Sequence, residues 1–112
     1  MKIWQILVPV SDNEGNIFSV AHHRAWDAVV RRLARGGLTI QQPAKGEWTM
    51  QDGKIIREEM IPVSVIANFD QMVSIVEFTA QHYRQKAVFY YVISEQVYIY
   101  GDNKIKAFYG PS

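Results

Sequence analysis

Apolar and polar residues alternate along this chain with two different periods. Over residues 20–35 and 68–85 the apolar positions recur every three or four residues, which predicts two amphipathic helices. Elsewhere, short runs rich in Ile, Val, Leu and Tyr lack that spacing and predict strands. The predicted strands cover residues 2–10, 38–42, 54–66, 87–94, 96–100 and 105–109.

Both predicted helices carry end signals. Ser19 is a suitable N-cap for the first helix, because its hydroxyl can accept a hydrogen bond from a free N–H group. Gly36 and Gly37 predict where that helix stops. Asn68 and Gln71 have the spacing of a capping box, which predicts the start of the second helix.

The strongest turn signal in the chain is Asp52-Gly53. It predicts a two-residue hairpin turn, in which both central residues adopt positive φ. In that register Trp48 lies opposite Arg57, and Glu47 lies opposite Glu58. Because side chains alternate between the two faces of a strand, one face of the hairpin is mostly apolar and is expected to meet the core. That face carries Trp48, Met50, Ile55, Arg57 and Glu59.

The order of the elements is strand, helix, strands, helix, strand, with a C-terminal strand extension. It predicts an α+β, ferredoxin-like fold, a split βαβ sandwich with two helices on one face of an antiparallel sheet. The other face is expected to carry apolar residues, namely Ile6, Val8, Phe89, Tyr91 and Ile93. Because a large apolar face is unfavourable in water, the sequence predicts a homodimer through the sheet face or the C-terminal strands.

Composition limits the possible functions. The 112 residues fit a single domain over positions 1–112, and 48% hydrophobic residues suffice for a core. The chain has no cysteine, which excludes disulfides, thiolate catalysis and cysteine zinc sites. The net charge of +1 gives no indication of nucleic-acid binding. No signal peptide or membrane-spanning stretch is recognisable, so we expect a cytoplasmic protein without membrane contact.

Four short motifs follow one another in the middle of the chain. They are Gly37-Leu38-Thr39-Ile40, Gly46-x-Trp48, Asp52-Gly53-Lys54-Ile55-Ile56-Arg57-Glu58 and Gln85-Lys86-Ala87-Val88. Together they resemble a family of small uncharacterised bacterial proteins, a domain of unknown function. The match spans residues 3–93, and the chain departs from it at Glu59-Met60. The resemblance implies a ferredoxin-like fold and no assigned activity.

The three histidines do not form a metal-ligand pattern such as His-Glu-x-x-His. His22 lies on the apolar stripe of the first helix, where a buried and hydrogen-bonded imidazole is expected. His23 can pair with Asp27 one turn further on. His82 lies near the end of the second helix, where the helix dipole favours a cation. We therefore expect neither a metal nor a cofactor.

Trp48, Arg57 and Glu59 form the best candidate site. Arg57 and Glu59 are two residues apart on one strand face, so they must be paired if they are buried. One interpretation is a salt bridge at the sheet rim, shielded by Trp48. The other is a pocket in which Arg57 binds a small anion and Glu59 acts as acid or base, with His22 and a tyrosine in its lining.

Two classes of function therefore remain open. The sequence favours a non-enzymatic, dimeric binding or interaction module. The alternative is a cofactor-independent enzyme or small-ligand-binding protein with its pocket near Trp48, Arg57 and Glu59. A pocket that reaches Arg57 would support the alternative.

Overall fold

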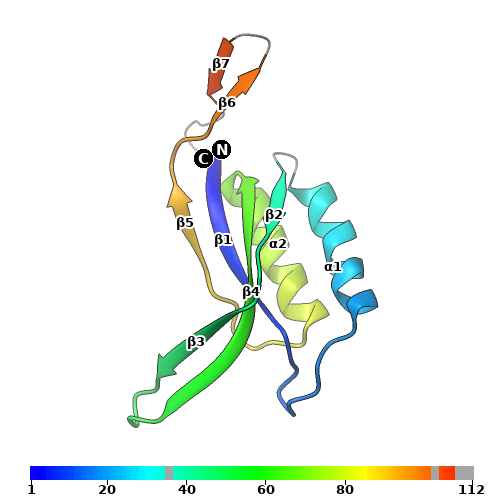
Figure 1. Cartoon of the computed structure of the whole chain (residues 1–112), viewed down its shortest axis with the longest axis vertical. Coiled ribbons are helices and arrows are strands. Elements are labelled where there is room, and N and C mark those ends of the chain that lie inside the picture. The colour runs from blue at the N-terminus through cyan, green and yellow to red at the C-terminus, as the bar shows by residue number, and fades with distance from the viewer. Residues whose placement is uncertain (35–36, 102–103, 108–112) are drawn as a thin grey trace.

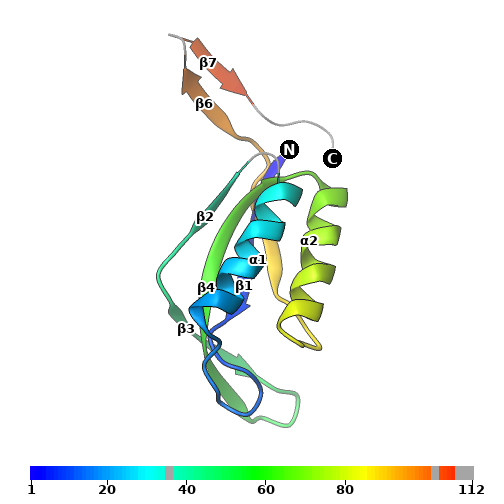
Figure 2. The same cartoon turned by 90° about the vertical axis from the view of Figure 1, so that its right-hand side faces the viewer.

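The computed structural model describes residues 1–34, 37–101 and 104–107. Its elements are β1 (Lys2–Pro9), α1 (Val20–Leu33), β2 (Leu38–Ile40), β3 (Ala44–Thr49), β4 (Ile55–Ala67), α2 (Phe69–His82), β5 (Tyr90–Ser94), β6 (Tyr98–Gly101) and β7 (Lys104–Ala107). The main sheet has the order β2-β4-β1-β5, and β3 pairs with the other end of β4. All neighbouring strands are antiparallel. Both helices cover one face of the sheet (Figures 1 and 2), so the predicted ferredoxin-like α+β fold is confirmed.

The core lies between the sheet and the two helices. Trp4, Ile6 and Val8 of β1 point into it and pack in one cluster with Trp26 and Val30 of α1. The prediction that Ile6 and Val8 lie on the outer face is therefore wrong. Both faces of β1 are apolar, and the helices cover the face with the even-numbered residues, which are buried as a result.

The outer face of the sheet, opposite the helices, carries apolar side chains from the edge strand β5. Tyr91 is 47% exposed and Ile93 is 50% exposed, as expected from the sequence. The Tyr91 hydroxyl accepts a hydrogen bond from the side-chain amide of Gln5 on β1, at 2.6 Å. This face is therefore mixed in character, with apolar residues of β5 beside the polar Gln5 of β1.

A buried polar side chain joins the two helices. The indole Nε1 of Trp26 donates to Oγ1 of Thr79 at 2.9 Å, and that hydroxyl donates to the Ile75 carbonyl at 2.6 Å. Each of these polar atoms thus has a partner within the core, which avoids the cost of an unsatisfied group. Thr79 and Ile75 are both fully buried.

The predicted helix starts are confirmed. The Ser19 hydroxyl accepts from the N–H of His22 at 3.1 Å, and Asn68 and Gln71 form a reciprocal capping box. The helices end at Leu33 and His82, two to three residues earlier than predicted. Of the predicted stop signal, Gly37 has positive φ, whereas Gly36 lies outside the described residues.

Strand β4 changes its neighbour at Pro62. On one side of that residue it pairs with β2, and on the other it pairs with β3. Between them the Pro62 carbonyl accepts from the N–H of Gln41 at 3.0 Å. Leu7 of β1 lies opposite Pro62 but donates its N–H to the Phe89 carbonyl on the other side, so the missing N–H of Pro62 costs no hydrogen bond to β1. β2 ends at Ile40 and β5 begins at Tyr90, so both are shorter than predicted.

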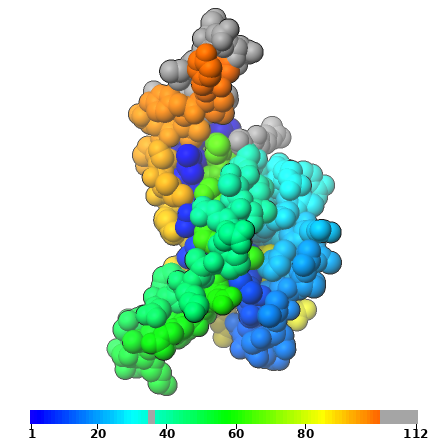
Figure 3. Space-filling model, in the orientation of Figure 1, coloured from blue at the N-terminus to red at the C-terminus, as the bar shows by residue number. Residues whose placement is uncertain are grey.

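The hairpin of β3 and β4, residues 44–59, projects from the sheet and is called the arm below (Figures 1 and 3). At its tip the Gly53 N–H donates to the Met50 carbonyl at 2.9 Å, and the Met50 N–H donates to the Lys54 carbonyl at 2.8 Å. Gly53 has a φ of +85°. The connection thus has three residues, with Gly53 in the left-handed region, and the predicted two-residue turn is wrong.

This turn shifts the pairing along the arm by one residue. Trp48 lies opposite Ile56, Glu47 lies opposite Arg57, and Gly46 lies opposite Glu58. The predicted pairs Trp48–Arg57 and Glu47–Glu58 are wrong, because a shift of one residue exchanges the two faces of a strand. The predicted core-facing side is also wrong, since Met50, Ile55 and Arg57 are exposed on the arm.

The C-terminal strands β6 and β7 form a separate two-stranded ribbon. They project from one end of the sheet, and the arm projects from the other end (Figure 1). The predicted return pairing after residue 104 is confirmed for Lys104–Ala107, and Tyr109 lies outside the described residues. In the part of the chain that is described, no helix is long and apolar enough to cross a membrane.

The left-handed conformation of Gly53 predicts a clear stability effect. Gly53→Val should lower the free energy of unfolding by about 1 kcal/mol or more, because a β-branched residue tolerates positive φ poorly. Gly101→Val is the matched control, since Gly101 lies outside the left-handed region and an added Cβ there meets no atom within 4 Å. Equal denaturant midpoints for the two variants would contradict the assigned turn.

Candidate functional site

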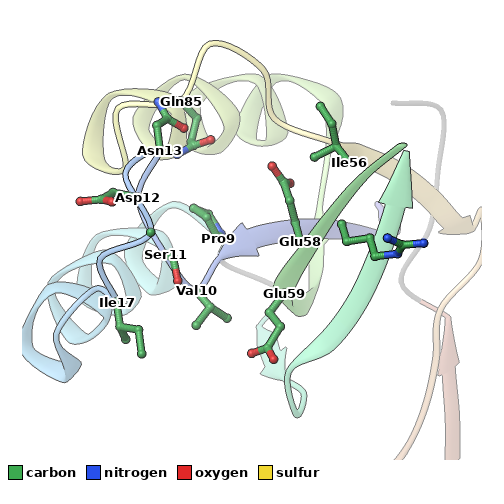
Figure 4. A pocket seen from close by; sticks show the side chains of 12 residues that line it. Pro9, Val10, Ser11, Asp12, Asn13, Ile17, Ile56, Glu58, Glu59 and Gln85 are labelled. Atoms are coloured by element: carbon green, nitrogen blue, oxygen red, sulfur yellow. The ribbon is translucent and has the colours of Figure 1, made fainter. Parts of the chain in front are cut away.

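A groove of about 560 Å³ lies at the base of the arm. Its walls come from residues 9–17, which lead from β1 to α1, from residues 56–59 of β4, and from Gln85 after α2 (Figure 4). The volume is within the range of small-molecule sites. Arg57 and Glu59, two of the predicted site residues, are part of its lining.

The loop on one side of the groove is held by Asp12. Its Oδ1 atom accepts from the N–H groups of Glu14 at 2.9 Å and Asn16 at 2.8 Å. The Asp12 backbone N–H donates to the Asn16 carbonyl, and Gly15 adopts positive φ to close the turn. This local network fixes the position of Asn13 at the groove.

The same hydrogen bonds affect the charge of Asp12. The N–H of Asn16 contributes most and that of Glu14 acts in the same direction, and against the effect of burial these hydrogen bonds lower the pKa of Asp12 below its ordinary value. Asp12 therefore carries a negative charge at neutral pH. Its carboxylate points away from the groove in Figure 4, so its main effect there is on the shape of the loop.

Glu58 is the acidic side chain that faces the groove. Figure 4 shows its carboxylate in the space between Ile56 and the neighbouring side chains of Asn13 and Gln85. The carboxylate of Glu59 points in the opposite direction, as the alternation of a strand requires. The sequence singled out Glu59, but the observed register gives the central position to Glu58.

The other face of the arm pairs its own charges. Nε of Arg57 lies 3.1 Å from Oε1 of Glu47, directly across the ladder, and their side chains are 71% and 62% exposed. Lys45 lies opposite Glu59 on the same face. These four residues, together with Glu58, also line a small hollow of about 200 Å³. The Arg57 guanidinium is therefore engaged with Glu47 and not with Glu59.

Trp48 is separated from Arg57 and Glu59 by the alternation of β3. Its indole stacks on Phe89 with a centroid distance of 4.3 Å and an angle of 3°. It also covers Gly46, where an added Cβ would lie 3.1 Å from the indole. The Trp48 Nε1 atom is buried and has no hydrogen-bond partner among the described residues. The predicted group of three is thus split between the two faces of the arm.

His22 belongs to a second hollow of about 450 Å³, on the other side of the Asp12 loop. Its ring stacks on that of His82 at 3.9 Å, and Phe18 and Phe78 stack on the outer sides at 5.0 and 5.3 Å. The Nε2 atom of His22 lies 2.9 Å from the His82 carbonyl, and the Nε2 atom of His82 lies 2.7 Å from the His22 carbonyl. Because carbonyls only accept, each Nε2 carries a hydrogen. The expected hydrogen bond of His22 is confirmed, but its side chain is half-buried and not buried as predicted. The two hydrogen bonds join α1 to α2.

His23 contacts Tyr83 through its Nδ1 atom, which lies 2.6 Å from the tyrosine hydroxyl. Burial, with a contribution from the neighbouring His22, lowers the pKa of His23 below its ordinary value of 6.5. Burial also raises the pKa of Tyr83, and the charge of Asp27 acts in the same direction. At neutral pH this pair therefore consists of an uncharged imidazole and a protonated hydroxyl.

Three residues of the groove were missed by sequence reasoning, namely Asn13, Glu58 and Gln85. Asn13 and Gln85 lie in loops that only the tertiary structure brings together. Glu58 was assigned to the wrong face because of the hairpin register. If Gln51-Asp52-Gly53 had been taken as a three-residue loop that ends in glycine, the resulting register would have placed Glu58 correctly.

No protein-family model matches the chain, and no curated protein matches it either. Solved structures do share its fold. The divalent cation tolerance protein Cut A1 from Thermus thermophilus aligns with a TM-score of 0.60 at 16% identity, over 82% of this chain and 81% of that chain. CutA from Synechococcus elongatus aligns with a TM-score of 0.53 at 16% identity, over 83% of this chain and 76% of that chain.

A phage SAM lyase in complex with S-methyl-5'-thioadenosine aligns with a TM-score of 0.57 at 10% identity, over 96% of this chain and 88% of that chain. At such identities the likeness concerns the fold alone. It agrees with the ferredoxin-like fold implied by the motifs, while the family of unknown function to which those motifs point stays a prediction.

The ion pair of Arg57 and Glu47 predicts a small coupling energy. Because both side chains are largely exposed, Arg57→Ala and Glu47→Ala should each lower stability by less than about 1 kcal/mol, with a coupling of about 0.5 kcal/mol. A double-mutant cycle in urea measures both. The matched cycle of Arg57 with Glu59 should give a coupling near zero, and a larger coupling there would contradict the observed pairing.

The lowered pKa of His23 predicts a loss of stability in acid. As pH falls below about 6.5 the unfolded chain gains a proton at His23 before the folded chain does, so the free energy of unfolding decreases. In His23→Gln this contribution is absent, and the loss between about pH 7.5 and about pH 5.5 should be smaller than in the wild type. Urea titrations at both pH values test this. If His23→Gln loses as much stability between the two pH values as the wild type does, other titrating groups cause the loss in acid.

Proposed function

We propose that this protein is a non-enzymatic binding module that assembles with a second copy of itself. The observation that carries the proposal is the arm, a two-stranded projection with exposed apolar side chains. Ile55 is 53% exposed and Met50 is 48% exposed, and both belong to the arm, which projects from the sheet (Figure 1). An isolated two-stranded hairpin is only marginally stable in water, so a partner surface would stabilise it.

The dimensions of the chain support the same proposal. Its radius of gyration is 15.4 Å, and its longest extent is 50 Å. A compact domain of this length has a radius of gyration of about 13 Å. The difference reflects the arm and the β6–β7 ribbon, which extend from opposite ends of the sheet (Figures 1 and 3). Projections of this kind gain buried area only by packing on another molecule.

The outer face of the sheet offers a complementary surface for the arm of a second copy. Tyr91 and Ile93 are half exposed on the edge strand β5. A homodimer is the simplest closed arrangement, because a two-fold axis lets each arm cover the sheet face of its partner. The occupant we propose is a second copy because one chain carries both apolar surfaces.

The groove gives the binding role a location. It presents a carboxylate, two side-chain amides and apolar walls, which are groups that hold and orient a ligand (Figure 4). The phage lyase with this fold was solved in complex with a small molecule, which supports a binding role for the fold. The alternative inferred from the sequence is a cofactor-independent enzyme or small-ligand-binding protein with its pocket near Trp48, Arg57 and Glu59. It stays a second candidate, because Arg57 and Glu59 line this groove, whereas Trp48 does not.

The proposed self-association predicts a doubled molecular mass in solution. Light scattering should give twice the chain mass for the wild type, and Ile55→Glu should shift the equilibrium towards the monomer, because a charge would be buried in the contact. Val20→Glu is the matched control. Val20 is 65% exposed on α1, in the helical layer, so this variant should keep the wild-type mass.

Either of two results would contradict the proposed assembly. One is a monomer mass for the wild type at every accessible concentration. The other is an equal effect of Ile55→Glu and Val20→Glu, which would show that the arm is not part of the contact. Thermal unfolding of each variant verifies that a changed mass does not come from a changed fold.

A further inference from the structure

We propose that the groove at the base of the arm binds a small organic cation, with Glu58 as the partner of a protonated amine. The sequence suggested an anion at Arg57, but the charges that the fold places in the groove have the opposite sign. The inference does not depend on self-association, because Glu58, Asn13 and Gln85 belong to one chain and line one cavity.

The carboxylate of Glu58 has no protein partner in the described part of the chain. The residue opposite it in the ladder is Gly46, which offers no side chain. Among the described residues, no hydrogen bond or ion pair reaches this carboxylate. Its direction in Figure 4 places it within the groove, near the middle of the three walls. A carboxylate in this position has all its acceptor sites available to a ligand.

The neighbouring charges make the groove favourable for a cation. Arg57 is the one basic side chain in the lining that the described residues form, and its guanidinium is paired with Glu47 on the other face of the arm. Asp12 is ionised at neutral pH, but its carboxylate points away from the groove, so Glu58 supplies the negative charge that faces it (Figure 4). An anion in the groove would therefore be repelled, whereas a cation would gain from a concave surface of one sign.

The uncharged walls define the rest of the ligand. Pro9 and Ile56 supply apolar surface on either side of Glu58, which suits a short hydrocarbon stem (Figure 4). Asn13 and Gln85 lie close together at one rim, where their amides can hold a second polar group. A short alkyl amine with a polar far end matches this arrangement, and diamines are the simplest members of that class.

Three probe molecules of similar length test the sign of the charge that the groove prefers. They are the cation putrescine, the uncharged diol of the same chain length, and the anion succinate. We expect putrescine to shift the backbone amide NMR signals of residues 10–17, 56–59 and Gln85 in the wild-type protein. The diol and succinate should leave these signals in place. Binding of succinate, or the absence of shifts with putrescine, would overturn the proposal.

Two isosteric variants then test the assigned residue. Glu58→Gln should weaken putrescine binding by at least about tenfold, because it removes a charge-assisted hydrogen bond. Glu77→Gln removes the same charge from an exposed position on α2 that is not part of the groove lining, and should bind like the wild type. Equal weakening of putrescine binding in both variants would show that the net charge of the protein, and not the position of Glu58, controls binding, and would overturn the proposed role of Glu58. Light scattering on the same samples reports self-association separately.

Discussion

The left-handed conformation of Gly53 is the constraint on which the arm depends. It turns the hairpin connection into a three-residue loop, and that loop sets the register of β3 against β4. A shift of one residue would move every side chain of the arm to the other face. The observed register pairs Arg57 with Glu47 and leaves Glu58 opposite a glycine. The chemistry of the groove therefore follows from the backbone conformation of one residue at the tip of the arm.

Strand β4 connects this arm to the core and belongs to two environments. From Met60 onwards it is mostly buried and pairs with β1 and β2, whereas Ile55–Glu59 is exposed on both faces. The change occurs beside Pro62, where β2 has ended and β3 has not yet begun. The core can therefore fix the direction of the arm without covering it, and the stack of Trp48 on Phe89 is a contact that holds the arm against the sheet.

Features of the fold that depend on local sequence could be predicted, and those that depend on distant partners could not. The caps at Ser19 and Asn68 involve residues three positions apart, so their spacing contains the necessary information. The buried face of β1 could not be predicted from the sequence, because both of its faces are apolar and only the position of the helices decides which one is covered. The hairpin register was ambiguous, since an Asp-Gly pair fits both a two-residue and a three-residue loop. The groove unites Asn13, Glu58 and Gln85, which no sequence spacing connects.

Water explains how the groove can keep an unpaired carboxylate. Glu58 is exposed, so its charge stays hydrated and does not lower the stability of the free protein. The balance changes when a ligand displaces that water, because the interaction between opposite charges strengthens as the surroundings become less polar. An apolar stem lying against Pro9 and Ile56 would create such surroundings at Glu58. In the proposed site the apolar walls and the carboxylate would therefore act together, and the groove would discriminate most strongly between molecules of similar size that differ in charge.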